Sequence, residues 1–238
     1  MALLIQVEQL AELVGDSAVI VVDCRYQLND RYRGYQDYCQ GHIPGAHYAS
    51  LGDDLSGPGP RVAGRHPLPQ TAKFAGFLAE IGVTGQQNVV AYDDMGGQMA
   101  ARFWWLCRWL GFDQVMLLDG GWQAWCAEHA QSTEKVTRPN SGSIQITVRP
   151  ELVIDAESLR RGLDNRCLRL IDARAEQRFR GEDEPLDPVA GHIPGAINHP
   201  FSLNLGGDNR FHSATRLRQI YTPLLAGFRP PQVVHSCG

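Results

Sequence analysis

Gly41-His42-Ile43-Pro44-Gly45-Ala46 is a six-residue segment that returns unchanged as Gly191-His192-Ile193-Pro194-Gly195-Ala196. The Pro-Gly pair inside each copy is typical of a turn that leads into an extended segment. Asp23-Cys24-Arg25 precedes the first copy, and Asp172-Ala173-Arg174 precedes the second. The two motifs therefore recur in the same order, at spacings of 149 residues (from 23 to 172) and 150 residues (from 41 to 191).

A third match joins two predicted strands. Asn88–Tyr92 and the run beginning at Val233 are short, apolar and rich in valine, which favours buried strands. When Val89 is placed on Val233, Asp93 falls on Cys237, at a spacing of 144 residues. Three matches in one order predict two copies of one domain, with a cysteine at the strand end in the second copy only.

The order of the predicted elements indicates the fold class. Apolar residues at helical spacing predict helices, and continuous apolar runs predict strands that are buried on both faces. The helices are expected at 7–14, 71–81, 98–110, 120–125 and 156–163, and the strands at 18–23, 88–92, 115–118 and 168–172. Alternating strands and helices predict an α/β fold, with a parallel sheet flanked by helices in each copy.

The repeat also predicts the domain boundaries. We expect a first domain at 1–130, a linker at 131–150, which is polar and contains Pro139-Asn140-Ser141-Gly142, and a second domain at 151–238. The first copy runs on for 32 residues after Asp93, to Trp125, whereas one residue follows Cys237. We therefore expect the second domain to be incomplete in this chain.

Composition excludes several classes of protein. The chain has 238 residues, 43% of them hydrophobic, a net charge of −4 and a pI of about 6.0, which favours a globular protein and argues against binding to nucleic acid or an anionic membrane. There is no apolar run of roughly 20 residues and no convincing signal peptide. The six cysteines form no C-x-x-C motif, so we expect no metal site and no disulfide framework, but reduced thiols in a cytoplasm. Glycine-rich phosphate-binding motifs are missing from the sequence, and no cofactor is expected.

Together, the doubled D-x-R and G-H-I-P-G-A motifs, RFWWLCRWLG at 102–111, LLDGGWQAW at 117–125 and the final HSCG resemble the tandem-domain rhodanese family. This family contains thiosulfate and 3-mercaptopyruvate sulfurtransferases, and the resemblance covers essentially the whole chain. It implies two tandem rhodanese-like domains, the first inactive and the second catalytic. It also implies a cysteine persulfide that passes sulfur from a small-molecule donor to cyanide, a thiol or a thioredoxin-like reductant.

Cys237 is the predicted nucleophile. A thiolate at the start of a strand-to-helix loop is stabilised by converging backbone N–H groups and by the helix N-terminus. Position alone does not separate a catalytic cysteine from a buried structural one; the repeat and the resemblance favour catalysis. Asp93 cannot carry a transferable sulfur, so we expect the first domain to be inactive. The other five cysteines are predicted to be structural.

The resemblance assigns Arg178 to the binding of the anionic donor, and a guanidinium fork suits a carboxylate or thiosulfonate group. The alternative is a solvated loop arginine, and Arg180 is a second candidate on the same segment. Mercaptopyruvate-specific relatives usually carry an arginine after a Glu-Pro pair, where this chain has Leu186. Gly238 instead resembles the Cys-Gly start of mercaptopyruvate-type loops. The two indications conflict, and we favour 3-mercaptopyruvate slightly over thiosulfate.

Several further residues are predicted to support the site. Asp172 and Arg174 are expected to fix its geometry, by hydrogen bonds to the loop or by pairing with each other. His42 and His192 are expected to hydrogen-bond within their own turns. His235 precedes the nucleophile by two residues and is a weaker candidate for adding positive potential.

Arg102 follows the loop of the first copy, and the resemblance suggests that it reaches toward the donor. Two other functions stay open at this stage. A cysteine phosphatase shares this domain shape but needs a C-x5-R loop, and a non-catalytic binding module or fragment would need no activated thiol.

Overall fold

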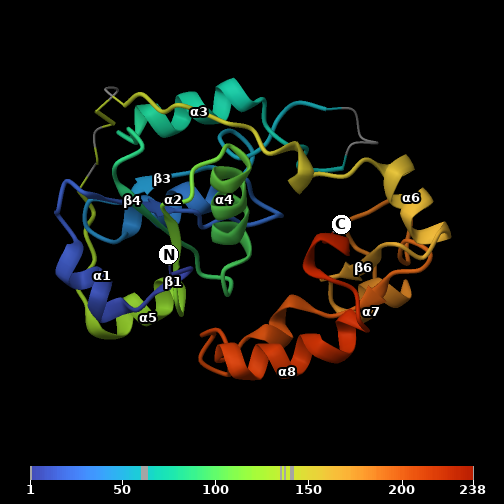
Figure 1. Cartoon of the computed structure of the whole chain (residues 1–238). Helices are drawn as coiled ribbons and strands as arrows, with labels where there is room; N and C mark the ends of the chain where they lie inside the picture. Colours follow the sequence, from blue (N-terminus) through green and yellow to red (C-terminus); the bar gives the residue numbers. More distant parts are fainter. Residues whose placement is uncertain (1, 60–63, 135, 137, 140–141, 238) are drawn as a thin grey trace. The chain divides into compact units, whose positions relative to one another are not determined.

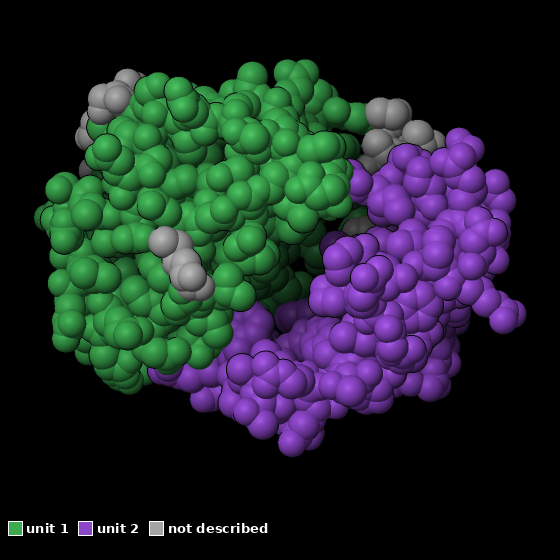
Figure 2. Space-filling model, in the orientation of Figure 1, with its two compact units in different colours: residues 1–152 green, residues 153–238 purple. Residues whose placement is uncertain are grey.

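The computed structural model describes residues 2–59, 64–134, 136, 138–139 and 142–237 (Figure 1). The chain divides into two compact units, Met1–Leu152 and Val153–Gly238, which Figure 2 colours separately. The described residues of the predicted linker, 131–150, fall within the first of these units. Among the described residues, no helix has the length and apolar character that crossing a bilayer would need.

The first unit is built on a sheet of five parallel strands. Their order is β1-β5-β4-β2-β3. The strands are β1 (Leu4–Ile5), β2 (Val19–Asp23), β3 (His47–Tyr48), β4 (Asn88–Tyr92) and β5 (Val115–Leu118). The neighbours β2 and β4 are buried along nearly their whole length, which explains why both read as continuous apolar runs.

Helices cover both faces of this sheet. They are α1 (Val7–Leu13), α2 (Arg33–Gln40), α3 (Thr71–Glu80), α4 (Gln98–Trp109) and α5 (Gly121–Glu128). Leu10 of α1 and Trp125 of α5 pack in one cluster with Val90 of β4, and the two helices lie beside each other in Figure 1. Phe74 of α3 and Phe103 of α4 make an edge-to-face contact with ring centroids 5.8 Å apart, so these two helices form a second packed pair.

The second unit repeats the middle of this sheet. Its strands β6 (Arg169–Asp172), β7 (Ile197–Asn198) and β8 (Val233–Ser236) have the order β7-β6-β8, which corresponds to β3-β2-β4. Its helices are α6 (Ala156–Asp164), α7 (Glu176–Arg180) and α8 (Ala214–Leu225). Short 3-10 helices are found at Pro150–Leu152 in the first unit and at Phe201–Asn204 and Pro230–Gln232 in the second.

The strand register shows which residues of the two copies correspond to each other. Asp23 pairs with Tyr92 in the first unit, and Asp172 pairs with Ser236 in the second. The residue that follows Tyr92 is Asp93, and the residue that follows Ser236 is Cys237. The α/β fold with parallel sheets is confirmed, and Cys237 occupies the strand-end position that Asp93 has in the first unit.

Several elements were not predicted, among them β1, α2, α7 and α8. Strand β1 has two residues and is defined by its pairing with β5, more than a hundred residues away in the chain. Helices α2 and α7 are short and carry few apolar residues, and α8 contains Pro223, which interrupts the expected helical pattern.

Candidate active site

Asp93 lies at the end of β4, and its carboxylate is surrounded by backbone N–H groups. Oδ1 accepts hydrogen bonds from the N–H of Met95 and of Gly97, at 2.9 and 2.8 Å. Oδ2 accepts from the N–H of Met99 and of Ala100, at 2.7 and 2.9 Å. The residue is 1% exposed, so four amide dipoles replace water around a buried anion.

The local sequence explains this cradle. Gly96 and Gly97 have φ angles of 70° and 90°, in the left-handed region that glycine adopts without steric cost. The loop therefore turns sharply into α4, whose first N–H groups have no partner inside the helix. The same geometry binds anions in general at helix N-termini, so the position after this strand is suited to a negative charge.

Cys237 occupies the matching position after β8. The residue is exposed, whereas burial raises the pKa of the Cys24 and Cys107 thiols well above the ordinary value and keeps them protonated. Gly238, a predicted donor-binding residue, lies outside the described residues. Ser236 stands where the first copy has Tyr92, and its buried Oγ has no hydrogen-bond partner among the described residues.

The two D-x-R motifs make the same contacts. Arg25 donates from Nη2 to Asp23 Oδ2 at 2.6 Å and to the carbonyl oxygen of Gly41 at 2.6 Å. Arg174 donates from Nη2 to Asp172 Oδ2 at 2.7 Å and to the carbonyl oxygen of Gly191 at 2.7 Å. Each arginine thus ties the end of a strand to the first glycine of the repeated hexapeptide, which is a structural contact in both copies.

The hexapeptide forms a hydrogen-bonded turn in both units. The N–H of Ala46 donates to Ile43 at 2.9 Å, and that of Ala196 donates to Ile193 at 3.0 Å. The expectation that the histidines bond within these turns is wrong. Nδ1 of His42 contacts the carbonyl oxygen of Tyr38 in α2, and the His42 ring stacks on the Tyr38 ring. In the second copy, His192 does the same with Phe179 of α7, so each histidine joins its turn to a helix.

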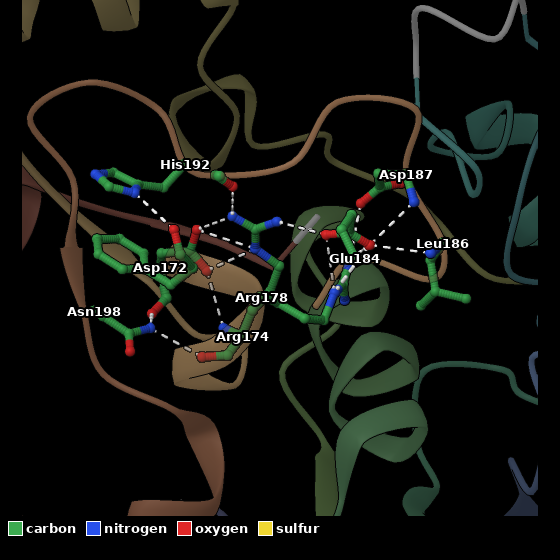
Figure 3. Close-up of polar contacts among 10 residues, drawn as sticks. Asp172, Arg174, Arg178, Glu184, Leu186, Asp187, His192 and Asn198 are labelled. Atoms are coloured by element: carbon green, nitrogen blue, oxygen red, sulfur yellow. Dashed lines mark hydrogen bonds and ion pairs between the residues drawn. The ribbon is translucent and has the colours of Figure 1, made fainter. Parts of the chain in front are cut away.

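Arg178 is held by two carboxylates (Figure 3). Its Nη2 donates to Glu184 Oε1 at 2.9 Å and to Asp187 Oδ2 at 2.8 Å, and its Nε donates to Glu184 Oε2 at 3.1 Å. Glu184 Oε2 also accepts from Arg174 Nη1 at 3.3 Å. The predicted donor-binding arginine therefore belongs to one network with Arg174 and Asp172.

Glu184 is the centre of this network. Its side chain is 3% exposed, and its Oε1 accepts from the backbone N–H of Leu186 and of Asp187 at 3.1 and 3.0 Å. Burial acts to raise the pKa of this carboxyl, but the hydrogen bonds from Arg178 and from the two amides outweigh it and lower the pKa to about 2. Glu184 and Asp187 were not predicted as site residues; the run Asp183-Glu184-Pro185 signals nearby charge, but not which carboxylate turns inward.

Three other predicted residues, Arg180, His235 and Arg102, have different surroundings among the described residues. Arg180 is exposed and pairs with Glu176 on the surface of α7. The pKa of His235 is lowered, first by desolvation of the ring and then by His199, which disfavours a positive charge on its imidazole. Arg102 donates to the carbonyl oxygens of Leu55 and His66 in the first unit, at 3.0 and 2.9 Å.

The fold and the site define a class of protein: a tandem α/β protein in which an anion-holding loop follows a central strand of a parallel sheet. A model of the Rhodanese-like domain family matches residues 6–128. The chain is 45% identical, over 239 residues, to a probable 3-mercaptopyruvate sulfurtransferase of Pseudomonas aeruginosa, with 100% of this chain and 84% of the relative covered. It is 37% identical, over 210 residues, to a putative thiosulfate sulfurtransferase, SseB, of Mycobacterium tuberculosis, with 84% of this chain and 72% of the relative covered.

The solved structures agree. The crystal structure of SseA from Escherichia coli, described as a 3-mercaptopyruvate sulfotransferase with the rhodanese fold, superposes with a TM-score of 0.82 at 28% sequence identity. The match covers 100% of this chain and 89% of that one. The chain belongs to the rhodanese family.

Proposed function

We propose that this chain is a sulfurtransferase that moves a sulfur atom from a small anionic donor to a thiophilic acceptor through a persulfide on Cys237. The observation that carries the proposal is the cradle around Asp93. In the first unit, the residue after the central strand holds a buried negative charge on four backbone N–H groups. In the second unit, the strand register gives this position to Cys237. A cradle of this kind stabilises a thiolate and, after reaction, the terminal sulfur of a persulfide.

The chemistry is a double displacement. The Cys237 thiolate attacks the outer sulfur of the donor, a new S–S bond forms, and the donor's bond to that sulfur breaks. Thiosulfate leaves as sulfite with the electron pair, whereas 3-mercaptopyruvate leaves as the enolate of pyruvate, which then takes up a proton. An acceptor nucleophile attacks the terminal sulfur and releases the thiolate, so no external oxidant or reductant is needed.

The names of the relatives support both donors, since they include 3-mercaptopyruvate and thiosulfate sulfurtransferases. Within this proposal, Arg178 binds the anionic group of the donor, while Asp172 and Arg174 hold the strand end in place. The first domain carries a carboxylate in place of the nucleophile and acts as an inactive partner. Cyanide, a small thiol or a thioredoxin-like protein in the cytoplasm would accept the sulfur.

The test is the intact mass of the protein after incubation with each donor. We expect the wild-type protein to gain the mass of one sulfur atom and to lose it when cyanide is added. Cys237→Ser should remove this gain. Cys167→Ser is the matched control, because Cys167 is the other exposed cysteine of the second unit, and it should load normally.

Two outcomes contradict the proposal. Wild-type protein that takes up no sulfur from either donor does not act as a sulfurtransferase, and hydrolysis of an aryl phosphate by the same sample would then favour the phosphatase alternative. Sulfur that remains on Cys237→Ser would show that another thiol carries it.

A further inference from the structure

A polar hollow of about 410 Å³ lies in the first unit, at the carboxyl ends of its central strands. Arg25 and Asp94 line it, and each follows the last residue of a strand by two positions, in β2 and in β4. The strand β3 pairs with β2 on one side and β4 pairs with it on the other, so the strand order reverses here. Open parallel sheets commonly bind ligands at such a point, and the volume is in the range of small-molecule sites.

Arg25 offers hydrogen-bond donors to this hollow. Its Nε and Nη2 bind the carboxylate of Asp23, and Nη2 also binds the carbonyl oxygen of Gly41. No described residue accepts a hydrogen bond from its Nη1. In the second unit, Nη1 of the matching Arg174 donates to the carboxylate of Glu184 at 3.3 Å (Figure 3). The first unit therefore repeats the arginine without the carboxylate that binds this edge of it.

Asp94 offers an acceptor on the same hollow. Its backbone carbonyl oxygen accepts from Nε2 of Gln123 at 2.8 Å, which holds this part of the loop in place. Its side chain is partly buried, and desolvation, followed by the charge of Asp93, raises its pKa. Arg25 attracts the carboxylate, but in the part of the chain that the structure describes the two side chains form no ion pair. The charge of Asp94 is thus not compensated by direct contact.

We propose that this hollow binds a free α-amino acid, whose carboxylate accepts from Nη1 of Arg25 and whose ammonium group donates to Asp94. An α-amino acid carries both charged groups on one carbon atom, so it bridges two side chains of opposite charge that do not touch each other. The remaining lining suits a polar ligand, because every lining residue except Gly41 and Trp122 is charged or carries a side-chain amide. The site belongs to the unit that lacks the nucleophile, so the inference does not depend on sulfur transfer.

The experiment screens the standard amino acids against the whole protein, leaving out cysteine because its thiol can react as a sulfur acceptor. Thermal unfolding followed by tryptophan fluorescence reports on the first unit, and isothermal titration calorimetry gives the affinity. We expect at least one amino acid to bind with a dissociation constant below about 1 mM. Its amide, which lacks the negative charge, and its N-acetyl derivative, which lacks the positive charge, should bind at least about tenfold more weakly, since each loses a charge-assisted contact.

Asp94→Asn and Glu12→Gln locate the binding. Asparagine keeps the shape of Asp94 but removes the charge that pairs with the ammonium group, so we expect the affinity to fall at least about tenfold. Glu12 is an exposed carboxylate on α1 and does not line the hollow, so Glu12→Gln changes the net charge equally and should bind like the wild type. Thermal unfolding of each variant without ligand checks that weaker binding does not come from loss of the fold.

Three results would overturn the inference. The first is that no amino acid shows saturable binding to the wild-type protein. The second is equal affinity of Asp94→Asn and wild type, which would mean that the ligand binds elsewhere. The third is an amide or an N-acetyl derivative that binds as tightly as its parent amino acid, which would contradict the bridge between Arg25 and Asp94. Sulfur loading of Cys237 is measured separately, so none of these results counts for or against the proposed function.

Discussion

Asp93 shows how much one buried side chain can organise, because its two carboxylate oxygens accept four backbone hydrogen bonds. Asp93→Ala removes the acceptor of all four hydrogen bonds. The N–H groups then stay buried with neither water nor a protein acceptor, which is unfavourable. We expect the first unit to lose about 3 kcal/mol of unfolding free energy, the upper part of the range for single substitutions. Urea denaturation followed by tryptophan fluorescence measures this unit alone, since all five tryptophans lie between residues 104 and 125.

Asp94→Ala is the matched control for this prediction. It removes a neighbouring carboxylate that accepts none of the four hydrogen bonds, so we expect a clearly smaller effect. Equal losses for the two variants would mean that the carboxylate of Asp93 does not hold the loop. In that case the hydrogen bonds around Asp93 would not support the inference that the matching position stabilises the Cys237 thiolate.

At the scale of an element, α7 and the segment that follows it are tied together by Glu184. Replacing it by glutamine removes a charge that pairs with both Arg174 and Arg178, and we expect a loss of about 2 kcal/mol at pH 7. The folded-state pKa lies below the usual 4.5, at about 2. The stabilisation by Glu184 is therefore fully present above about pH 4.5 and disappears as the pH falls toward 2.

The measurement is the thermal unfolding of wild type and Glu184→Gln at several pH values, followed by circular dichroism. The two proteins should differ at pH 7 and converge as the pH falls to about 2. Glu182→Gln is the control, because Glu182 is 59% exposed and lies 3.8 Å from Arg180. It should change stability by less than about 0.5 kcal/mol at any pH. A difference between wild type and Glu184→Gln that persists unchanged at low pH would refute the assignment.

The elements also show where sequence reasoning succeeds and where it stops. The strands β2, β4, β5 and β6 were predicted nearly to the residue, because a strand buried on both faces must be a continuous apolar run. The sequence repeat alone was enough to align Cys237 with Asp93. The short helix α7 and the inward turn of Glu184 and Asp187 were missed, because they depend on contacts between side chains that no periodic pattern records.

At the scale of the molecule, the two units differ sharply in how much apolar surface they bury. Among the buried apolar side chains of the described residues, only Leu170 and Ile171 belong to the second unit. Helix α4 contains several buried side chains, including Phe103 and Leu106, whereas α8, of the same length, contains none. Burial of apolar area is the main source of stability, so we expect the second unit to open far more readily than the first.

Hydrogen exchange measured by mass spectrometry tests this expectation on matched strands. After correction for the intrinsic rates of each sequence, amides of β8 should exchange at least about tenfold faster than those of β4, and those of α8 faster than those of α4. Sulfur loading provides a second condition, since a persulfide that is held by backbone N–H groups should slow exchange around Cys237 and leave β4 unchanged. Equal protection of β4 and β8 in the unloaded protein would contradict the difference in stability, and would mean that the second unit is held by contacts beyond its own small core.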